Sequence, residues 1–213
     1  MTEVAVPTLI DRAVIGDGDT AYVLGCGPSA VEGLELMDPE NCCLAVNKAI
    51  LLDNPCKNLI WFCEDNRLAE SDWFEEAFRE NWERTCFCGI LAGQYPPRYR
   101  FNASRFTFRE DLFMGGIRRF GADMTYGGAT VACRAMQQLA LLGVPNIVLV
   151  GVDMRGREHW DGTRAIYREE DLQNGDVWRK SHVFSDIVRW VQTYCDSRIF
   201  SLTPTAINVP QLN

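Results

Sequence analysis

Short, uninterrupted apolar runs are the feature of this sequence that most constrains its fold. Residues 20–24 read TAYVL, 42–46 read CCLAV, 59–63 read LIWFC and 147–150 read IVLV. A strand that is apolar at every position is buried on both faces, which is typical of a parallel sheet covered by helices. Helical periodicity separates the runs, so the sequence predicts an α/β fold. We expect a doubly wound, mainly parallel, Rossmann-like sheet with helices on both faces.

The segments between and after these runs carry helix and strand signals. Ser29 is expected to cap a helix that continues to about Met37, with Glu32 as its capping-box partner. Further helices are expected within 65–84, over 129–142 with Gly143 as the C-cap, and over 181–194, and further strands over 86–91 and 198–202.

Length and segment character predict one domain over residues 1–213. Residues 93–124 are irregular and rich in arginine and aromatic residues, so they could form a flap over one face. Residues 155–180 are polar and could form a mobile lid over a ligand. The aromatic-rich part of the flap, residues 101–120, could instead be an interface in a homo-oligomer.

Composition excludes several classes of protein. The chain has 21 Lys and Arg against 29 Asp and Glu, a net charge of -8, and therefore lacks the basic surface of a general nucleic-acid binder. No apolar run approaches the roughly 20 residues of a membrane span. Nine cysteines, an odd count, with no leader pattern at the start of the sequence, favour free thiols and a cytoplasmic location.

A glycine-rich turn follows the first apolar run and is the first candidate site. Glycine lets backbone N–H groups approach a ligand closely, and the start of the following helix favours an anion. The turn does not match a dinucleotide or Walker fingerprint, and a tight turn without a ligand is the alternative. Its residues are Gly25, Cys26, Gly27, Pro28 and Ser29.

Two further candidates lie at the ends of other elements. Asn47 follows the second apolar run, where its amide could bind a base or ribose, although asparagine is also common in turns. Gly127 and Gly128, with Thr130, precede the helix at 129–142 and could form a second anion cradle or simply allow close packing of that helix.

Asp153 and two nearby residues form another candidate group. The Asp153 carboxylate follows the apolar run at 147–150, where it could bind ribose hydroxyls, hold a metal ion or cap the next segment. Together with His159 and Asp161 it could make an oxygen-rich divalent site, although their spacing is loose. His182 is expected near the start of the last long helix, where it could act as a general base or lie on the surface.

The order and spacing of these motifs resemble a related pair of families over about residues 20–205. The segments are VLGCGPS at 23–29, AVN at 45–47, GGATVA at 127–132 and LLGVPNIVLVGVD at 141–153. One family is the bacterial CMP-sialic-acid-dependent sialyltransferases. The other is the domain shared by archaeal 6-hydroxymethyl-dihydropterin pyrophosphokinases and flagellin-glycosylation accessory proteins.

The resemblance to the sialyltransferases implies roles for individual residues. Cys26 stands where that family has an asparagine that contacts CMP, and Asn47 matches a family asparagine near the nucleotide. The segment from Gly127 to Thr130 corresponds to one that touches the donor. His182 matches the family's general base, and Tyr167 matches a tyrosine that helps the phosphate leave. Thr203 belongs to a TPT segment that looks like the family's loop after its last strand.

Three functions follow as hypotheses. The leading one is a sialyltransferase-like glycosyltransferase that moves a sugar from a CMP-type donor to a hydroxyl acceptor without a metal or other cofactor. The second, implied by the other family, is transfer of pyrophosphate from ATP to a pterin-like alcohol, with Mg²⁺ held by Asp153 and its neighbours. The third is a nucleotide-binding module without catalysis, which the missing asparagine at Cys26 favours.

Overall fold

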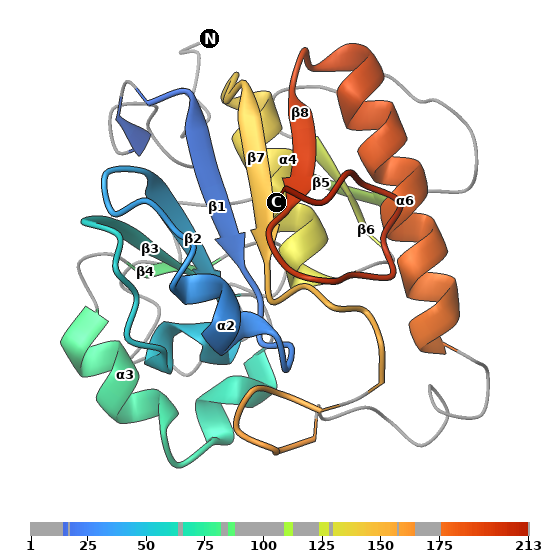
Figure 1. Ribbon diagram of the computed structural model, residues 1–213. Helices are drawn as coiled ribbons and strands as arrows, with labels where there is room; N and C mark the ends of the chain where they lie inside the picture. The colour runs from blue at the N-terminus through green and yellow to red at the C-terminus, as the bar shows by residue number, and fades with distance from the viewer. Residues whose placement is uncertain are drawn as a thin grey trace, which may run out of the picture.

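A six-stranded parallel sheet organises the part of the chain that the structure describes. The computed structural model describes residues 15–16, 18–63, 66–81, 85–87, 109–112, 124–127, 130–156, 158–164 and 176–212. The strand order is β4-β3-β2-β1-β7-β8, and every pairing is parallel. The predicted α/β, doubly wound architecture is therefore confirmed (Figure 1). The strands are β1 (Thr20–Leu24), β2 (Cys42–Val46), β3 (Asn58–Cys63), β4 (Thr85–Phe87), β7 (Asn146–Val150) and β8 (Arg198–Ser201).

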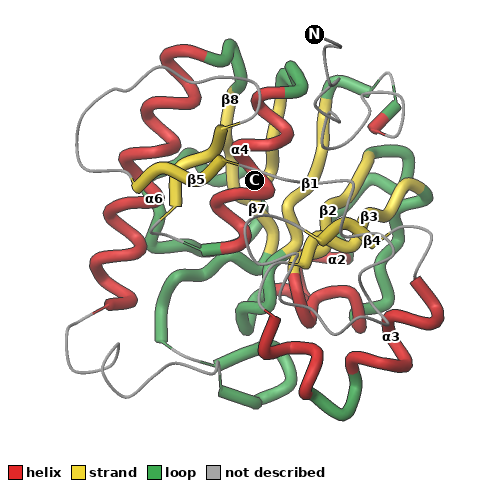
Figure 2. The backbone as a smooth tube through the Cα atoms, turned by 180° about the vertical axis from the view of Figure 1, so that it is seen from behind, coloured by secondary structure: helices red, strands yellow, loops and turns green. Residues whose placement is uncertain are grey.

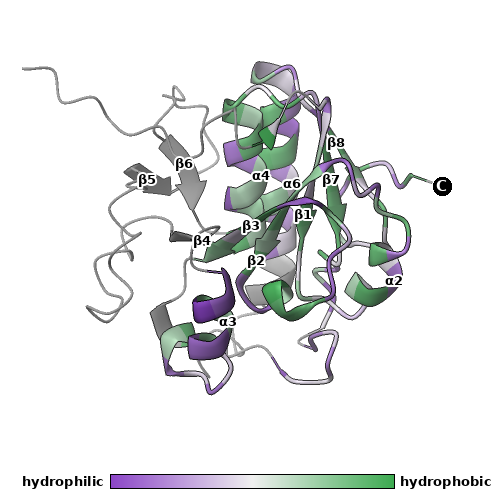
Figure 3. Ribbon diagram, turned by 90° about the vertical axis from the view of Figure 1, so that its left-hand side faces the viewer, coloured by the Kyte–Doolittle hydropathy of each residue, from purple (hydrophilic) through white to green (hydrophobic). Residues whose placement is uncertain are grey.

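Helices cover both faces of this sheet. Alternate residues of each strand face opposite sides, and because the strands are apolar on both sides, each face packs against helices. In β1, Val23 packs into one core with helices α4 and α6, whereas Leu24 packs into a second core with α2 and α3. Figure 2 shows α4 and α6 together on one face, and Figure 3 shows apolar strands beside a polar α3. The helices are α2 (Ala30–Leu34), α3 (Phe74–Asn81), α4 (Val131–Leu141), α6 (Asp176–Tyr194) and the 3-10 helices η1 (Asn47–Leu51) and η2 (Asn66–Glu70).

Several expected boundaries differ from those observed. The helix from Ser29 ends at Leu34 instead of about Met37, and Ser29 makes no side-chain capping bond because its hydroxyl is used elsewhere. The helix expected within 65–84 is divided into η2 and α3, and the strand expected over 86–91 is the shorter β4.

The last helix differs most. Helix α6 begins at Asp176, five residues before its expected start, because a polar segment is as compatible with a helical turn as with a loop.

Two predicted features lie partly outside the described residues. Within the flap expected at 93–124, the structure describes β5 (Arg109–Leu112) and one residue of β6 (Met124–Gly127), which pair in parallel. Within the lid expected at 155–180, it describes the turn at 158–164 and the first residues of α6. None of the helices in the described ranges combines the length and apolarity needed to span a bilayer.

Candidate functional site

The strand order places a topological switch point between β1 and β7. From β1 the chain adds β2, β3 and β4 on one side, and then returns to add β7 and β8 on the other. In parallel sheets, ligands bind beyond the carboxyl ends of the strands at such a point. Helix α4 precedes β7 and runs antiparallel to it, so the start of α4, capped by Thr130, also faces this edge (Figure 1).

The glycine-rich turn after β1 is bonded to the end of β7. The backbone N–H of Gly25 donates to Val150 O at 2.7 Å, and that of Gly27 donates to Gly151 O at 2.8 Å. A Cβ on Gly27 would lie 2.2 Å from Oδ2 of Asp153, so this glycine is required by a close approach within the protein.

Asp153 completes the same junction. Ser29 N donates to Asp153 Oδ2 at 3.0 Å, and the Ser29 hydroxyl donates to Oδ1. The carboxylate therefore lies where the turn would receive an anion. The amides of Gly25 and Gly27 and the amide and hydroxyl of Ser29 are thus bonded within the protein, and the role of this turn as an anion cradle stays a prediction.

The expected metal group is also not formed. Asp153 is bonded to Ser29, whereas Asp161 forms an ion pair with Lys48. Across the described residues, no group of three His, Cys, Asp or Glu side chains is placed to hold a metal ion. The residues around Asp153 therefore do not fit the Mg²⁺ that pyrophosphate transfer would need, and we derive no step through it.

Cys26 is a half-buried residue between the ends of β1 and β2. Its Sγ donates to Val46 O at 3.3 Å, and its carbonyl accepts from Trp160 N at 3.0 Å. Burial raises the pKa of the Cys26 thiol to about 12, which keeps it protonated. The seven cysteines for which the structure describes the side chain are free thiols, as predicted.

Asn47 is the most informative of the predicted site residues. It stands at the carboxyl end of β2 with a φ of 50°, a left-handed conformation that asparagine tolerates better than most residues. Its carbonyl accepts from Trp61 Nε1 at 2.7 Å. Its side-chain Oδ1, however, is buried and has no hydrogen-bond partner. The backbone conformation explains the asparagine, but it does not explain an unpaired buried acceptor.

Trp160 carries a second buried polar atom without a partner, its indole Nε1. The backbone bond from Trp160 to Cys26, and the bond from Cys26 to Val46, bring the backbones of Trp160 and Asn47 to the turn that follows β1. The site therefore holds one unpaired acceptor and one unpaired donor.

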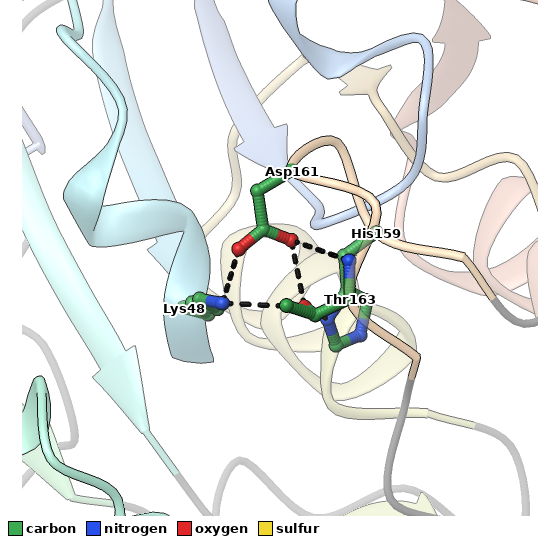
Figure 4. Close-up of polar contacts among 4 residues, drawn as sticks. All are labelled: Lys48, His159, Asp161 and Thr163. Atoms are coloured by element: carbon green, nitrogen blue, oxygen red, sulfur yellow. Dashed lines mark hydrogen bonds and ion pairs between the residues drawn. The ribbon is translucent and has the colours of Figure 1, made fainter.

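A polar cluster beside Asn47 was not predicted as a unit. Lys48 follows Asn47 and reaches the turn at 158–164, where its Nζ pairs with Asp161 and donates to Thr163 Oγ1 at 3.2 Å (Figure 4). His159 Nδ1 lies 3.3 Å from the same Thr163 oxygen. The position of Lys48 two residues after an apolar strand was the sequence signal that could have identified it.

The remaining predicted residues are structural or lie elsewhere. Thr203 accepts from Gly151 N at 3.0 Å, and Thr130 accepts from Cys133 N at 3.3 Å as the cap of α4. Gly127 ends β6, opposite Leu112. Gly128 and Tyr167 lie outside the described residues.

His182 is exposed and is the seventh residue of α6, so it does not lie at the helix start as expected. It was the residue matched to the general base, and its place on an exposed helix face distinguishes it from His159, which lies in the polar cluster.

Comparisons with family models, curated proteins and solved structures find no match to this chain.

Proposed function

We propose that this chain is a sialyltransferase-like glycosyltransferase, which binds a CMP-type sugar donor at the carboxyl edge of β1, β2 and β7. The observation that carries the proposal is the buried, unpaired Oδ1 of Asn47 at this edge. A buried acceptor without a partner costs about 1–3 kcal/mol, so a ligand that donates to it gains an interaction that the protein alone lacks.

Trp160, whose backbone is bonded to the turn after β1, adds a second requirement for the ligand through its indole Nε1. It is a buried donor without a partner, so the site offers one acceptor and one donor. The pyrimidine edge of CMP presents both an amine donor and ring acceptors, and its ribose hydroxyls can act in both senses. A purely apolar ligand would leave both protein atoms unpaired.

The phosphate of the donor needs a cation, since the amides of Gly25, Gly27 and Ser29 are bonded within the protein. Lys48 is the neighbour of Asn47, and its side chain is 15% exposed. Its present partner is the Asp161 carboxylate, for which a phosphate would compete. The start of α4 adds the positive end of a helix dipole at the same edge.

The reaction that we propose is a direct displacement. The acceptor hydroxyl oxygen forms a bond to the anomeric carbon of the sugar as the bond from that carbon to the phosphate oxygen breaks. The electron pair leaves with CMP, and the hydroxyl proton passes to a base. By resemblance that base would be His182 and the leaving phosphate would be assisted by Tyr167, and His159 in the polar cluster is the other histidine available as the base.

A thermal-shift screen with CMP, CDP, ATP and GTP tests the binding step. We expect CMP and CDP to raise the melting temperature, and Lys48→Met to weaken their binding about 10- to 100-fold because a charged hydrogen bond is lost. Lys57→Met is the matched control, because the Lys57 side chain is 68% exposed and pairs with Glu40 at the surface. If no nucleotide shifts the melting temperature, the proposal is wrong.

One observation favours a nucleotide-binding module without catalysis as a second candidate. The donors of the first turn are bonded to Gly151 and Asp153, so they do not stabilise a leaving phosphate. Incubating the bound protein with a CMP-sugar and measuring released CMP separates the two candidates. Binding with no release above the uncatalysed rate supports the module.

A further inference from the structure

Four polar side chains at the carboxyl edge form one hydrogen-bonded chain, which we call the Lys48–His159 chain (Figure 4). Thr163 Oγ1 is at its centre. This hydroxyl donates to Asp161 Oδ1 at 2.7 Å, receives a bond from Lys48 Nζ at 3.2 Å and lies 3.3 Å from His159 Nδ1. The turn that carries three of these residues is closed by a backbone bond from His159 N to Thr163 O at 2.8 Å.

The number of protons available fixes the direction of each bond. Desolvation alone would raise the pKa of Asp161, but hydrogen bonds from Lys48 and Thr163 and the ammonium charge hold it well below its usual range. The carboxylate is therefore ionised and can only accept. Thr163 has a single hydroxyl proton and gives it to Asp161, so its oxygen must accept from both Lys48 and His159.

This arrangement selects one tautomer of the imidazole. To donate to Thr163, His159 must carry its proton on Nδ1, which leaves a lone pair on Nε2. Within the described part of the chain, no residue bonds to Nε2. The Lys48–His159 chain thus orients an imidazole whose second nitrogen is available to accept a proton.

The Lys48–His159 chain lies next to the proposed donor site. Trp160 follows His159, and its backbone N–H donates to Cys26 O at the end of β1. Lys48 follows Asn47 at the end of β2. The imidazole therefore belongs to the turn that is docked against the two strand ends where the unpaired polar atoms lie.

We propose that Nε2 of His159 is the proton acceptor of this site, an inference that rests on the proposed function. When the acceptor hydroxyl attacks the anomeric carbon, its proton passes to Nε2 and the sugar–phosphate bond breaks with its electrons leaving on CMP. The imidazolium then returns the proton to solvent. Thr163 and Asp161 are positioning residues that hold the tautomer.

The electrostatics of the turn support this role. Burial and the charge of Lys48 lower the pKa of His159, whereas Asp161 opposes them, so the ring is neutral and able to accept a proton near neutral pH. The flanking charged residues are Glu158 and Arg164, which form a backbone bridge across the same turn.

The chain has only two histidines, which makes the tautomer directly measurable. In a two-dimensional ¹H–¹⁵N long-range NMR spectrum of the full chain, each imidazole gives one set of signals, and His182→Gln assigns them. We expect His159 to be the Nδ1–H form, and Thr163→Val to shift it toward the Nε2–H form. Thr193→Val is the matched control, because Thr193 is exposed and donates to Arg189 O. An Nε2–H signal for His159 in the unaltered chain overturns the proposal.

Turnover of a CMP-sugar is the second readout. We expect His159→Gln to lower kcat by about 10²–10⁴-fold with little change in donor affinity. His182→Gln tests the other histidine as the base. The proposal would be overturned if His182→Gln lost turnover while His159→Gln kept full activity. If the unaltered chain turns over no CMP-sugar, the proposed function fails, and the tautomer measurement alone decides whether His159 is held as a base.

Discussion

Replacing Asn47 by glycine and by alanine separates the two reasons for an asparagine at this position. Both variants remove the buried, unpaired Oδ1. Only glycine keeps the backbone relaxed at a φ of 50°. Both preserve the bond from Trp61 Nε1 to the backbone carbonyl. The comparison therefore isolates the amide from the backbone.

The expected magnitudes follow from these two terms. Removing an unpaired buried acceptor recovers about 1–3 kcal/mol, from which the greater chain entropy of glycine subtracts about 0.5–1 kcal/mol. Asn47→Gly should thus unfold in urea with a free energy equal to or above that of the original chain. Asn47→Ala should be less stable than Asn47→Gly by up to about 1.5 kcal/mol, because the strain of alanine in the left-handed region, about 1–2 kcal/mol, outweighs its smaller entropy cost, about 0.5–1 kcal/mol.

The affinity for CMP should fall in both variants, although the stability of Asn47→Gly is kept or raised. Without the amide, a ligand donor is left unpaired, so the Kd for CMP from calorimetry should rise about 5- to 150-fold in both variants. If Asn47→Gly were destabilised by more than about 1 kcal/mol, Oδ1 would have a structural partner and the reasoning would fail. Unchanged affinity for CMP would contradict it equally.

Three further predictions concern the surrounding residues. Gly27→Ala should lower the free energy of unfolding by about 1–3 kcal/mol, because its Cβ would meet Asp153. Gly18→Ala is the control and should change the free energy of unfolding little, because its Cβ would have its nearest neighbour at 3.7 Å. Urea unfolding measures both variants, and equal stability of the two would contradict the packing account. The pKa of Asp161 is depressed in the folded state, so its contribution to stability is present above the ordinary carboxyl pKa of about 4 and is lost as pH falls below that value. Asp161→Asn should therefore reduce the free energy of unfolding at neutral pH and reduce it progressively less in acid. A difference between this variant and the original chain that does not change with pH would argue against the ion pair. Cys26, with its raised pKa of about 12, should resist iodoacetamide at pH near 8 in the native chain and react after unfolding, as mass spectrometry would show, and rapid native labelling would refute its burial.

Most of the sheet could be predicted because its strands are apolar on both faces. TAYVL and CCLAV match β1 and β2 residue for residue. Helix α4 ends at Leu141 with Leu142 as its C-cap, and Gly143, the predicted C-cap, is the next residue and has a φ of 73°. The start of α6 could not be predicted in the same way, because the apolar stripe used to predict this helix begins at Val183, seven residues after Asp176.

The site was predictable only in its location. The ends of β1, β2 and β7 follow from the apolar runs, but the use of each polar group depends on partners distant in sequence. Ser29 and Asp153 are separated by 124 positions, and no local pattern reveals that they satisfy each other. The same holds for Lys48 and Asp161, which meet only because the turn at 158–164 docks against β1.

Titrating the ¹⁵N-labelled chain with CMP, and following its amide signals, tests the central claim most directly. We expect saturable shifts confined to residues 25–29, 47–48 and 158–163, where the unpaired polar atoms and the Lys48–His159 chain lie. Absence of shifts at millimolar CMP, or shifts restricted to the far end of α6, would contradict a nucleotide site at the carboxyl edge of this sheet.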